Sequence, residues 1–308
     1  MSAVLKPGLE PTATRKAVRL YTPPATLGGK LWGWRYLILR RSMQLGVMLM
    51  FFGTFHWGWK VLGAPLLRGN LSASEFLGVV PMADPFAVLQ QLVSGHSLHS
   101  TVLLGAAILL VFYALAGRVF CGWVCPMNLV TDLAGWLRTQ FKLNDLFRLS
   151  RSTRYWMMGM ALVLSALMGV AAFEWVSPIS MLHREIIYGA GMGLTAALGI
   201  FIIDLLILKH GWCGHLCPLG AFYGLLGKRA LMRVRFDDNT CTHCGECARV
   251  CPEPQVLNLK QATEHGMVTA GACTNCARCI PICPEHSLDF ALRWNARPAS
   301  DLRTRTQP

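Results

Sequence analysis

Two cysteine runs near the C-terminal end constrain this chain more than any other feature of its sequence. Both fit the pattern C-x2-C-x2-C-x3-C-P, and they occupy residues 241–252 and 273–284. Disulfide frameworks belong mostly to short secreted chains. Cysteines clustered at short fixed spacings in an apolar chain of 308 residues favour metal ligation instead.

The spacing within each run indicates two [4Fe–4S] clusters. One loop with three closely spaced cysteines wraps three corners of a cubane, and the fourth cysteine of the run ligates the other cluster. Structural zinc is the alternative, but it takes four ligands, usually as two separated pairs. We therefore predict two ligand sets. The first set is Cys241, Cys244, Cys247 and Cys283, and the second set is Cys273, Cys276, Cys279 and Cys251.

Most of the remaining chain is apolar. Hydrophobic residues make up 53% of the sequence and charged residues 15%, where a soluble domain has about 25% charged residues. Four segments approach the roughly 20 apolar residues that cross a bilayer. They lie at about 42–63, 101–120, 155–175 and 188–208. We expect an α-helical membrane protein with four transmembrane helices and a C-terminal α+β two-[4Fe–4S] ferredoxin-like domain; the alternative is a set of buried core helices.

Lysine and arginine are unevenly distributed among the segments that connect these apolar runs. The loops after the first and third runs hold only Arg68 and Arg184, whereas the other connecting segments are basic. Because cytoplasmic loops carry an excess of these residues, we expect a multi-pass protein of the bacterial inner membrane with both termini in the cytoplasm. Topology then explains the net charge of +13 without nucleic acid as a partner.

These features predict five consecutive segments. The first is basic and cytoplasmic, the second holds the four spans, and the third is a CxxxCP turn with an amphipathic connector. The fourth is the cluster domain and the fifth is a tail. Their boundaries are 1–41, 42–208, 209–236, 237–288 and 289–308.

The apolar part contains an internal repeat. Cys121-Gly-Trp-Val-Cys125-Pro126 follows the second apolar run, and Cys213-Gly-His-Leu-Cys217-Pro218 follows the fourth. An amphipathic helix that ends in basic residues is expected after each. The symmetry would bring the four cysteines together, either to bind a metal or a third redox centre or to act as a redox thiol pair. The alternative is buried thiols that pack a tight turn.

Asp204 lies inside the fourth apolar run. Burying an acidic side chain in such a segment has a high free-energy cost, and such residues are often functional. Asp204 is therefore our candidate proton acceptor for a quinol. The alternative is a structural pairing with Lys209 or Arg118. A second polar group, at Glu174, His183, Arg184 and Glu185, predicts either a docking surface or a site for a quinol head, or else a solvated loop.

Haem is not expected in this chain. A transmembrane haem with two histidine ligands needs two histidines inside the apolar runs, and only His56 lies well inside one. The sequence also contains no CxxCH motif for covalent attachment of haem.

Over nearly its whole length the chain resembles the NapH type of membrane ferredoxin-like subunits, which belong to periplasmic nitrate reductase systems. The resemblance covers the apolar runs, the two CxxxCP turns and the double cluster motif. It also includes Asp84-Pro85-Phe86 and the segments 175–184 and 211–218.

This resemblance implies an electron-transfer component of a quinol dehydrogenase, not a stand-alone enzyme. Electrons would come from the membrane quinone pool and pass through the clusters toward a periplasmic nitrate reductase. The implied partners are a periplasmic iron–sulfur subunit of the NapG type and a membrane-anchored multihaem cytochrome c of the NapC type. The rival interpretation is an iron–sulfur assembly or maturation factor that reduces a metal or a thiol for a respiratory enzyme.

Overall fold

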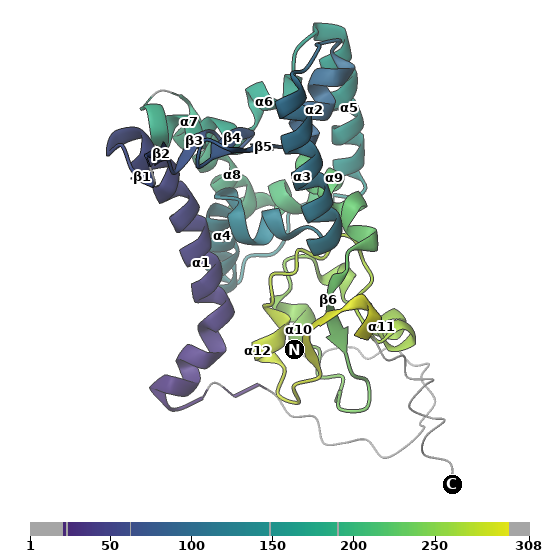
Figure 1. Ribbon diagram of the computed structural model, residues 1–308. Helices are drawn as coiled ribbons and strands as arrows, with labels where there is room; N and C mark the ends of the chain where they lie inside the picture. Colours follow the sequence, from purple (N-terminus) through teal and green to yellow (C-terminus); the bar gives the residue numbers. More distant parts are fainter. Residues whose placement is uncertain (1–20, 23, 62, 148, 190, 296–308) are drawn as a thin grey trace.

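The computed structural model describes residues 21–22, 24–61, 63–147, 149–189 and 191–295. The first 20 residues of the predicted basic segment and residues 296–308 of the predicted tail lie outside the described residues. Figure 1 shows the long helix α1 (Leu27–His56) along one side of the molecule and a group of helices opposite it. In this view the cluster domain lies below the group of helices opposite α1.

Eight further helices build the middle of the molecule. They are α2 (Pro85–Val93), α3 (Ser100–Ala116), α4 (Met127–Phe141), α5 (Thr153–Met168), α6 (Ala172–Val176), α7 (Pro178–Tyr188), α8 (Gly193–Ile202) and α9 (Pro218–Leu226). α5 packs against α9, and α4 packs against α8. Phe86 on α2 and Met127 on α4 are fully buried in the core of this part. Burial of each such side chain contributes about 1.5–3 kcal/mol to stability.

Short antiparallel strands lie at the C-terminal end of α1. β1 (Lys60–Val61) pairs with β2 (Ala64–Pro65). β3 (Leu67–Gly69), β4 (Ala73–Phe76) and β5 (Val80–Ala83) form a three-stranded sheet in that order. β3 contacts α1 and β5 contacts α3, so this sheet joins the two sides of the helical part.

The prediction of four transmembrane helices is wrong. Among the described residues, no helix combines the length and the apolar character that crossing a membrane requires. The apolar runs at 101–120 and 155–175 give helices of only 17 and 16 residues. They end at Gly117 (φ 81°) and Gly169 (φ 65°), in backbone conformations that glycine adopts readily and that stop a helix.

The other two runs are also divided. The run at 188–208 becomes the 10-residue α8 followed by the π-helical turn η2 (Ile203–Ile207). The run at 42–63 supplies only the last part of α1, whose middle carries Arg40 and Arg41. The prediction of a multi-pass inner-membrane protein with cytoplasmic termini depended on these spans and is therefore also wrong.

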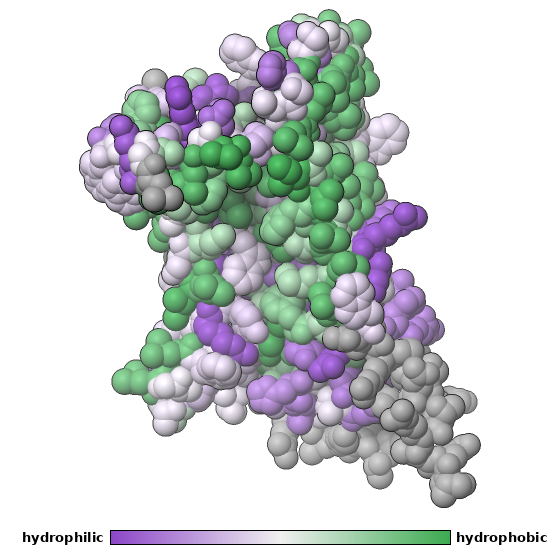
Figure 2. All heavy atoms as spheres, in the orientation of Figure 1, coloured by the Kyte–Doolittle hydropathy of each residue, from purple (hydrophilic) through white to green (hydrophobic). Residues whose placement is uncertain are grey.

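Many apolar side chains stay on the surface of the helical part. Figure 2 shows hydrophobic residues over its helices and more hydrophilic residues toward the cluster domain. Examples with more than half of their area exposed are Leu104 and Val111 on α3 and Val163 and Leu167 on α5. Apolar burial inside the helical part is thus incomplete, and buried ion pairs supply further contacts to the cluster domain.

The cluster domain has α+β structure, as the sequence predicted. β6 (Met232–Phe236) pairs antiparallel with β7 (Leu288–Leu292). α10 (Glu246–Val250), α11 (Leu259–His265) and α12 (Cys279–Ile282) complete it. Its separate core contains Val234, Val268 and Leu288. The domain approaches α9 closely at Gly271, where any Cβ would collide with the Gly224 carbonyl oxygen.

Candidate iron–sulfur centres

The first ligand set comes together around one cavity. Cys241, Cys244, Cys247 and Cys283 all line it. The loop turns around Cys244 because the residues on either side of it, His243 and Gly245, have φ values of 53° and 79°. The backbone N–H of His243 donates to Cys241 Sγ at 3.3 Å, and that of Ser287 donates to Cys283 Sγ at 3.4 Å. Such hydrogen bonds favour the thiolate form that binds metal.

The second run repeats the same backbone path. Asn275 and Ala277, on either side of Cys276, have φ values of 48° and 59°. A left-handed conformation costs a residue with a Cβ roughly 1–2 kcal/mol, and such strain collects at functional sites. The Asn275 amide holds this loop in place by donating to the Ala116 and Met232 carbonyl oxygens, both at 2.9 Å.

The fourth cysteine of each run lies with the opposite set. Burial is the largest effect that raises the pKa of the Cys251 thiol, and the nearby Cys276 and Cys273 raise it further. Cys251 therefore lies near the second set. Burial is the largest effect on the pKa of Cys241 and raises it, whereas the His243 N–H lowers it. Cys283 raises this pKa further, so Cys283 lies near the first set. Burial raises the pKa of Cys273 to about 11. Metal binding to these cysteines as thiolates would release their protons.

Eight soft thiolate ligands in two sets of four suit two [4Fe–4S] clusters. Among the described residues, no three or more histidine, cysteine or acidic side chains are placed to hold one metal ion. A cubane is larger than one ion, so its four ligands stand further apart.

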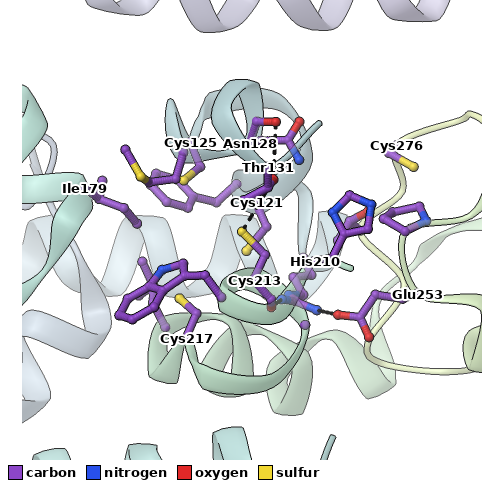
Figure 3. Close-up of a pocket in the computed structure, with 18 of the residues that line it drawn as sticks. Cys121, Cys125, Asn128, Thr131, Ile179, His210, Cys213, Cys217, Glu253 and Cys276 are labelled. Carbon is purple, nitrogen blue, oxygen red and sulfur yellow. Dashed lines mark hydrogen bonds and ion pairs between the residues drawn. The ribbon is translucent and has the colours of Figure 1, made fainter. Parts of the chain in front are cut away.

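The four cysteines of the repeated turns meet in a separate place, the four-cysteine cavity. Cys121 and Cys213 lie in the π-helical turns η1 (Phe120–Val124) and η3 (Trp212–Leu216). Cys125 and Cys217 end these turns. All four side chains line the cavity, and Cys276 and His210 reach it from the side of the cluster domain (Figure 3). The symmetry argument from the sequence thus predicted a true convergence.

A buried carboxylate next to this cavity binds three arginines. Glu253 accepts from Arg118 at 2.8 Å, Arg151 at 2.8 Å and Arg154 at 2.9 Å. Burial acts to raise the pKa of Glu253, but Arg118 and Arg154 hold it below its usual value. Three guanidinium groups thus face one carboxylate, which leaves a formal excess of two positive charges. These residues come from three distant segments of the chain, and no sequence spacing indicated their meeting.

A second buried carboxylate also has three arginine partners. Asp132 on α4 pairs with Arg40 at 3.0 Å and, more closely, with Arg41 and Arg278. Burial acts to raise the pKa of Asp132, but Arg278 and Arg40 lower it overall. This group joins α1, α4 and the second cluster loop. Arg40 and Arg41 precede Asp132 by 92 and 91 residues, so no spacing in the sequence indicated this group.

Asp204 is fully buried and has a structural position. Its Oδ1 accepts from the Trp212 N–H at 3.0 Å, at the start of η3. Burial raises its pKa to about 7, against the N–H groups of Trp212 and Gly211. Of its two suggested partners, Arg118 pairs with Glu253 instead. The role of Asp204 as a proton acceptor stays a prediction.

The polar group around His183 lies at another cavity of about 570 Å³. His183 is 1% exposed, and neither ring nitrogen has a hydrogen-bond partner among the described residues. Glu174 accepts from the hydroxyls of Ser72 at 2.6 Å and Ser180 at 2.9 Å. Glu185 caps the start of α8 instead, by accepting from the Leu194 N–H at 2.8 Å.

A larger cavity of about 830 Å³ lies between α1, α4 and the second cluster loop, and we call it the α1–α4 cavity. Leu37, Leu133 and Trp136 contribute apolar walls, whereas His210 and Cys276 line the same space. Apolar walls with a few convergent polar groups are typical of sites for small organic ligands. Of the cavities described here, this one and the four-cysteine cavity touch a cysteine of the second set.

Comparison with known proteins agrees with this chemistry. Residues 98–144 and 190–237 both match a family model described as a 4Fe-4S binding domain, and residues 233–284 match a 4Fe-4S dicluster domain. The chain is 44% identical to the ferredoxin-type protein NapH of Escherichia coli K12, over 77% of this chain and 83% of that protein. It is 45% identical to the methylamine utilization ferredoxin-type protein MauN of Methylorubrum extorquens, over 74% and 79%.

The chain belongs to the NapH and MauN family of ferredoxin-type proteins. The resemblance to NapH is thereby confirmed, and one family model matching twice confirms the internal repeat. The protein is a NapH-type iron–sulfur protein of electron transfer. No solved structure matches it.

Proposed function

We propose that this NapH-type protein takes electrons from a quinol and passes them through two [4Fe–4S] clusters toward a nitrate reductase system. Oxidation of one quinol to quinone releases two electrons and two protons. The clusters, when bound, supply one-electron redox chemistry, and two of them accept the two electrons. In the rival proposal, a maturation factor, the clusters or thiols reduce a metal or a thiol and no quinol is needed.

The α1–α4 cavity is the observation that carries the proposal. Its walls at Leu133 and Trp136 suit the apolar ring and tail of a quinol, and Cys276 lines the same space. A quinol bound there would lie beside a ligand of the second set, which favours direct electron transfer. His210 lines the cavity too and is our candidate for the group that accepts a quinol proton.

The first test is reduction of the clusters by quinol. We expect a ubiquinol or menaquinol analogue to reduce the clusters of anaerobically purified protein, seen by EPR as [4Fe–4S]⁺ signals. His210→Asn should slow this reduction about 100-fold, since a positioned proton acceptor contributes about 10²–10⁴-fold. Reduction by dithionite, which needs no proton acceptor, should be unchanged.

His183→Asn is the matched control, because it alters a buried histidine in the other cavity. It should leave the rate of quinol oxidation within about twofold. If His183→Asn slowed quinol oxidation and His210→Asn did not, the quinol site would lie in the cavity at His183 and not in the α1–α4 cavity. Clusters that dithionite reduces but no quinol reduces would favour the maturation factor.

The proposed partners are a NapG-type iron–sulfur subunit and a NapC-type multihaem cytochrome c. The similarity to two NapH proteins supports them. The similar identity to MauN proteins, which are named for methylamine utilization, makes that system the second candidate. Expression of this chain in strains that lack NapH or MauN separates the two. We expect it to restore quinol-dependent nitrate reduction and not growth on methylamine; the reverse result would contradict the nitrate assignment.

A further inference from the structure

We propose that Cys121, Cys125, Cys213 and Cys217 together hold a third [4Fe–4S] cluster, separate from the two in the cluster domain. This inference goes beyond the proposed function and does not depend on the identity of the electron donor. It rests on three observations: the content of the two repeats, the environment of the four thiols and the charge around them.

The content of the repeats requires a shared site. The two segments that match a 4Fe-4S binding model, 98–144 and 190–237, contain two cysteines each. A [4Fe–4S] cluster held by cysteine takes four thiolates, so neither repeat alone has enough. The fold brings both pairs to one cavity, where they supply four (Figure 3).

The backbone around the thiols is arranged alike in the two repeats. The N–H groups of Met127 and Asn128, at the start of α4, bond to Cys125. Those of Leu219 and Gly220, in the first turn of α9, bond to Cys217. N–H groups at a helix N-terminus stabilise negative charge on sulfur. Burial, the larger effect, still raises the pKa of both thiols above its usual value, so metal binding there would displace their protons.

The excess positive charge beside the cavity favours an anionic ligand. Arg118 is 1% exposed, lines the cavity and donates to the Cys213 carbonyl oxygen at 3.1 Å. Its Nε has no hydrogen-bond partner among the described residues. Buried charges are costly unless they are paired. Glu253 supplies one negative charge to its three arginine partners, so two positive charges are not balanced. Four neutral thiols would not offset that excess, whereas a cubane with four thiolate ligands is anionic.

The site also has a neighbour for electron exchange. Cys276 of the second set lines the same cavity as the four cysteines. A cluster at this position would lie next to the second set and extend the row of redox centres into the helical part.

Iron content of the unmutated protein tests the proposal. We expect about twelve iron and twelve acid-labile sulfide per chain, since each cubane carries four of each. The double variant Cys121→Ala/Cys213→Ala should contain about eight of each and keep the EPR signals of the cluster domain. Thr131→Val is the matched control. Its hydroxyl lies 3.8 Å from Cys213 Sγ in the same cavity, and this variant should keep all twelve.

Several results would overturn the third cluster. These are about eight iron in the unmutated protein, about ten iron from a two-iron cluster, or eight iron with stoichiometric zinc. Because the count is made first on the unmutated chain, a double variant that fails to fold leaves the test valid. Failure of quinol to reduce the protein would count against the proposed function and leave this iron count unaffected.

Discussion

Asp132→Asn is expected to destabilise the protein by about 3–5 kcal/mol, the usual cost of removing one partner from a buried ion pair. The Asp132 side chain is 6% exposed and balances Arg40, Arg41 and Arg278. Without its charge, three guanidinium groups would face one another at the junction of α1, α4 and the cluster domain. Urea denaturation of the cluster-loaded protein, followed by tryptophan fluorescence, measures the change.

Asp289→Asn is the matched control for this prediction. Asp289 pairs with Arg235, but the two side chains are 46% and 44% exposed. An exposed ion pair contributes about 0–1 kcal/mol, so the control should lose little. Equal losses in the two variants would mean that the Asp132 group does not hold the domains together.

The same group predicts how stability depends on pH. The folded state holds the pKa of Asp132 below its usual value, so the unfolded chain binds its proton more readily. The stabilisation from Asp132 is therefore complete above the unfolded pKa, about 3.9. It is lost as the pH falls through the lower folded pKa. Asp132→Asn should remove this part of the acid dependence, and an unchanged acid midpoint would contradict the assignment.

Cys251→Ala is expected to remove the same cluster as Cys273→Ala, although the two cysteines belong to different runs. Each variant should lose about four iron and four sulfide and retain the cluster of the first set. Cys283→Ala and Cys241→Ala should form the other matching pair. EPR spectra and reduction potentials of the remaining cluster should agree within a pair and differ between pairs.

This comparison separates crossed ligation from ligation within a run. If each run held its own cluster, Cys251→Ala would match Cys241→Ala instead. The geometry favours the crossed arrangement, since Cys251 lies near Cys273 and Cys276 while Cys283 lines the cavity of the first set.

The chemistry of the cluster domain could be predicted from sequence because it depends on local spacing. Three cysteines within seven residues face one small volume whatever the rest of the chain does, and the turns at His243 and Asn275 are local. The four-cysteine cavity was also predictable as a convergence, because a sequence repeat implies a structural repeat. The buried charges beside the cavity were not predictable, since Arg118 and Glu253 are 135 residues apart.

Helix lengths and charge pairing were decided by the tertiary structure. Hydropathy counts the apolar residues in a run but does not locate the turn that ends its helix, so glycines 117 and 169 divided runs that looked continuous. The pairing of Arg40 and Arg41 with Asp132 could not be predicted from the sequence, because Asp132 lies more than 90 residues away. Local spacing thus determined the cysteine chemistry of this protein, and only the folded chain determined which buried charges meet and where each helix stops.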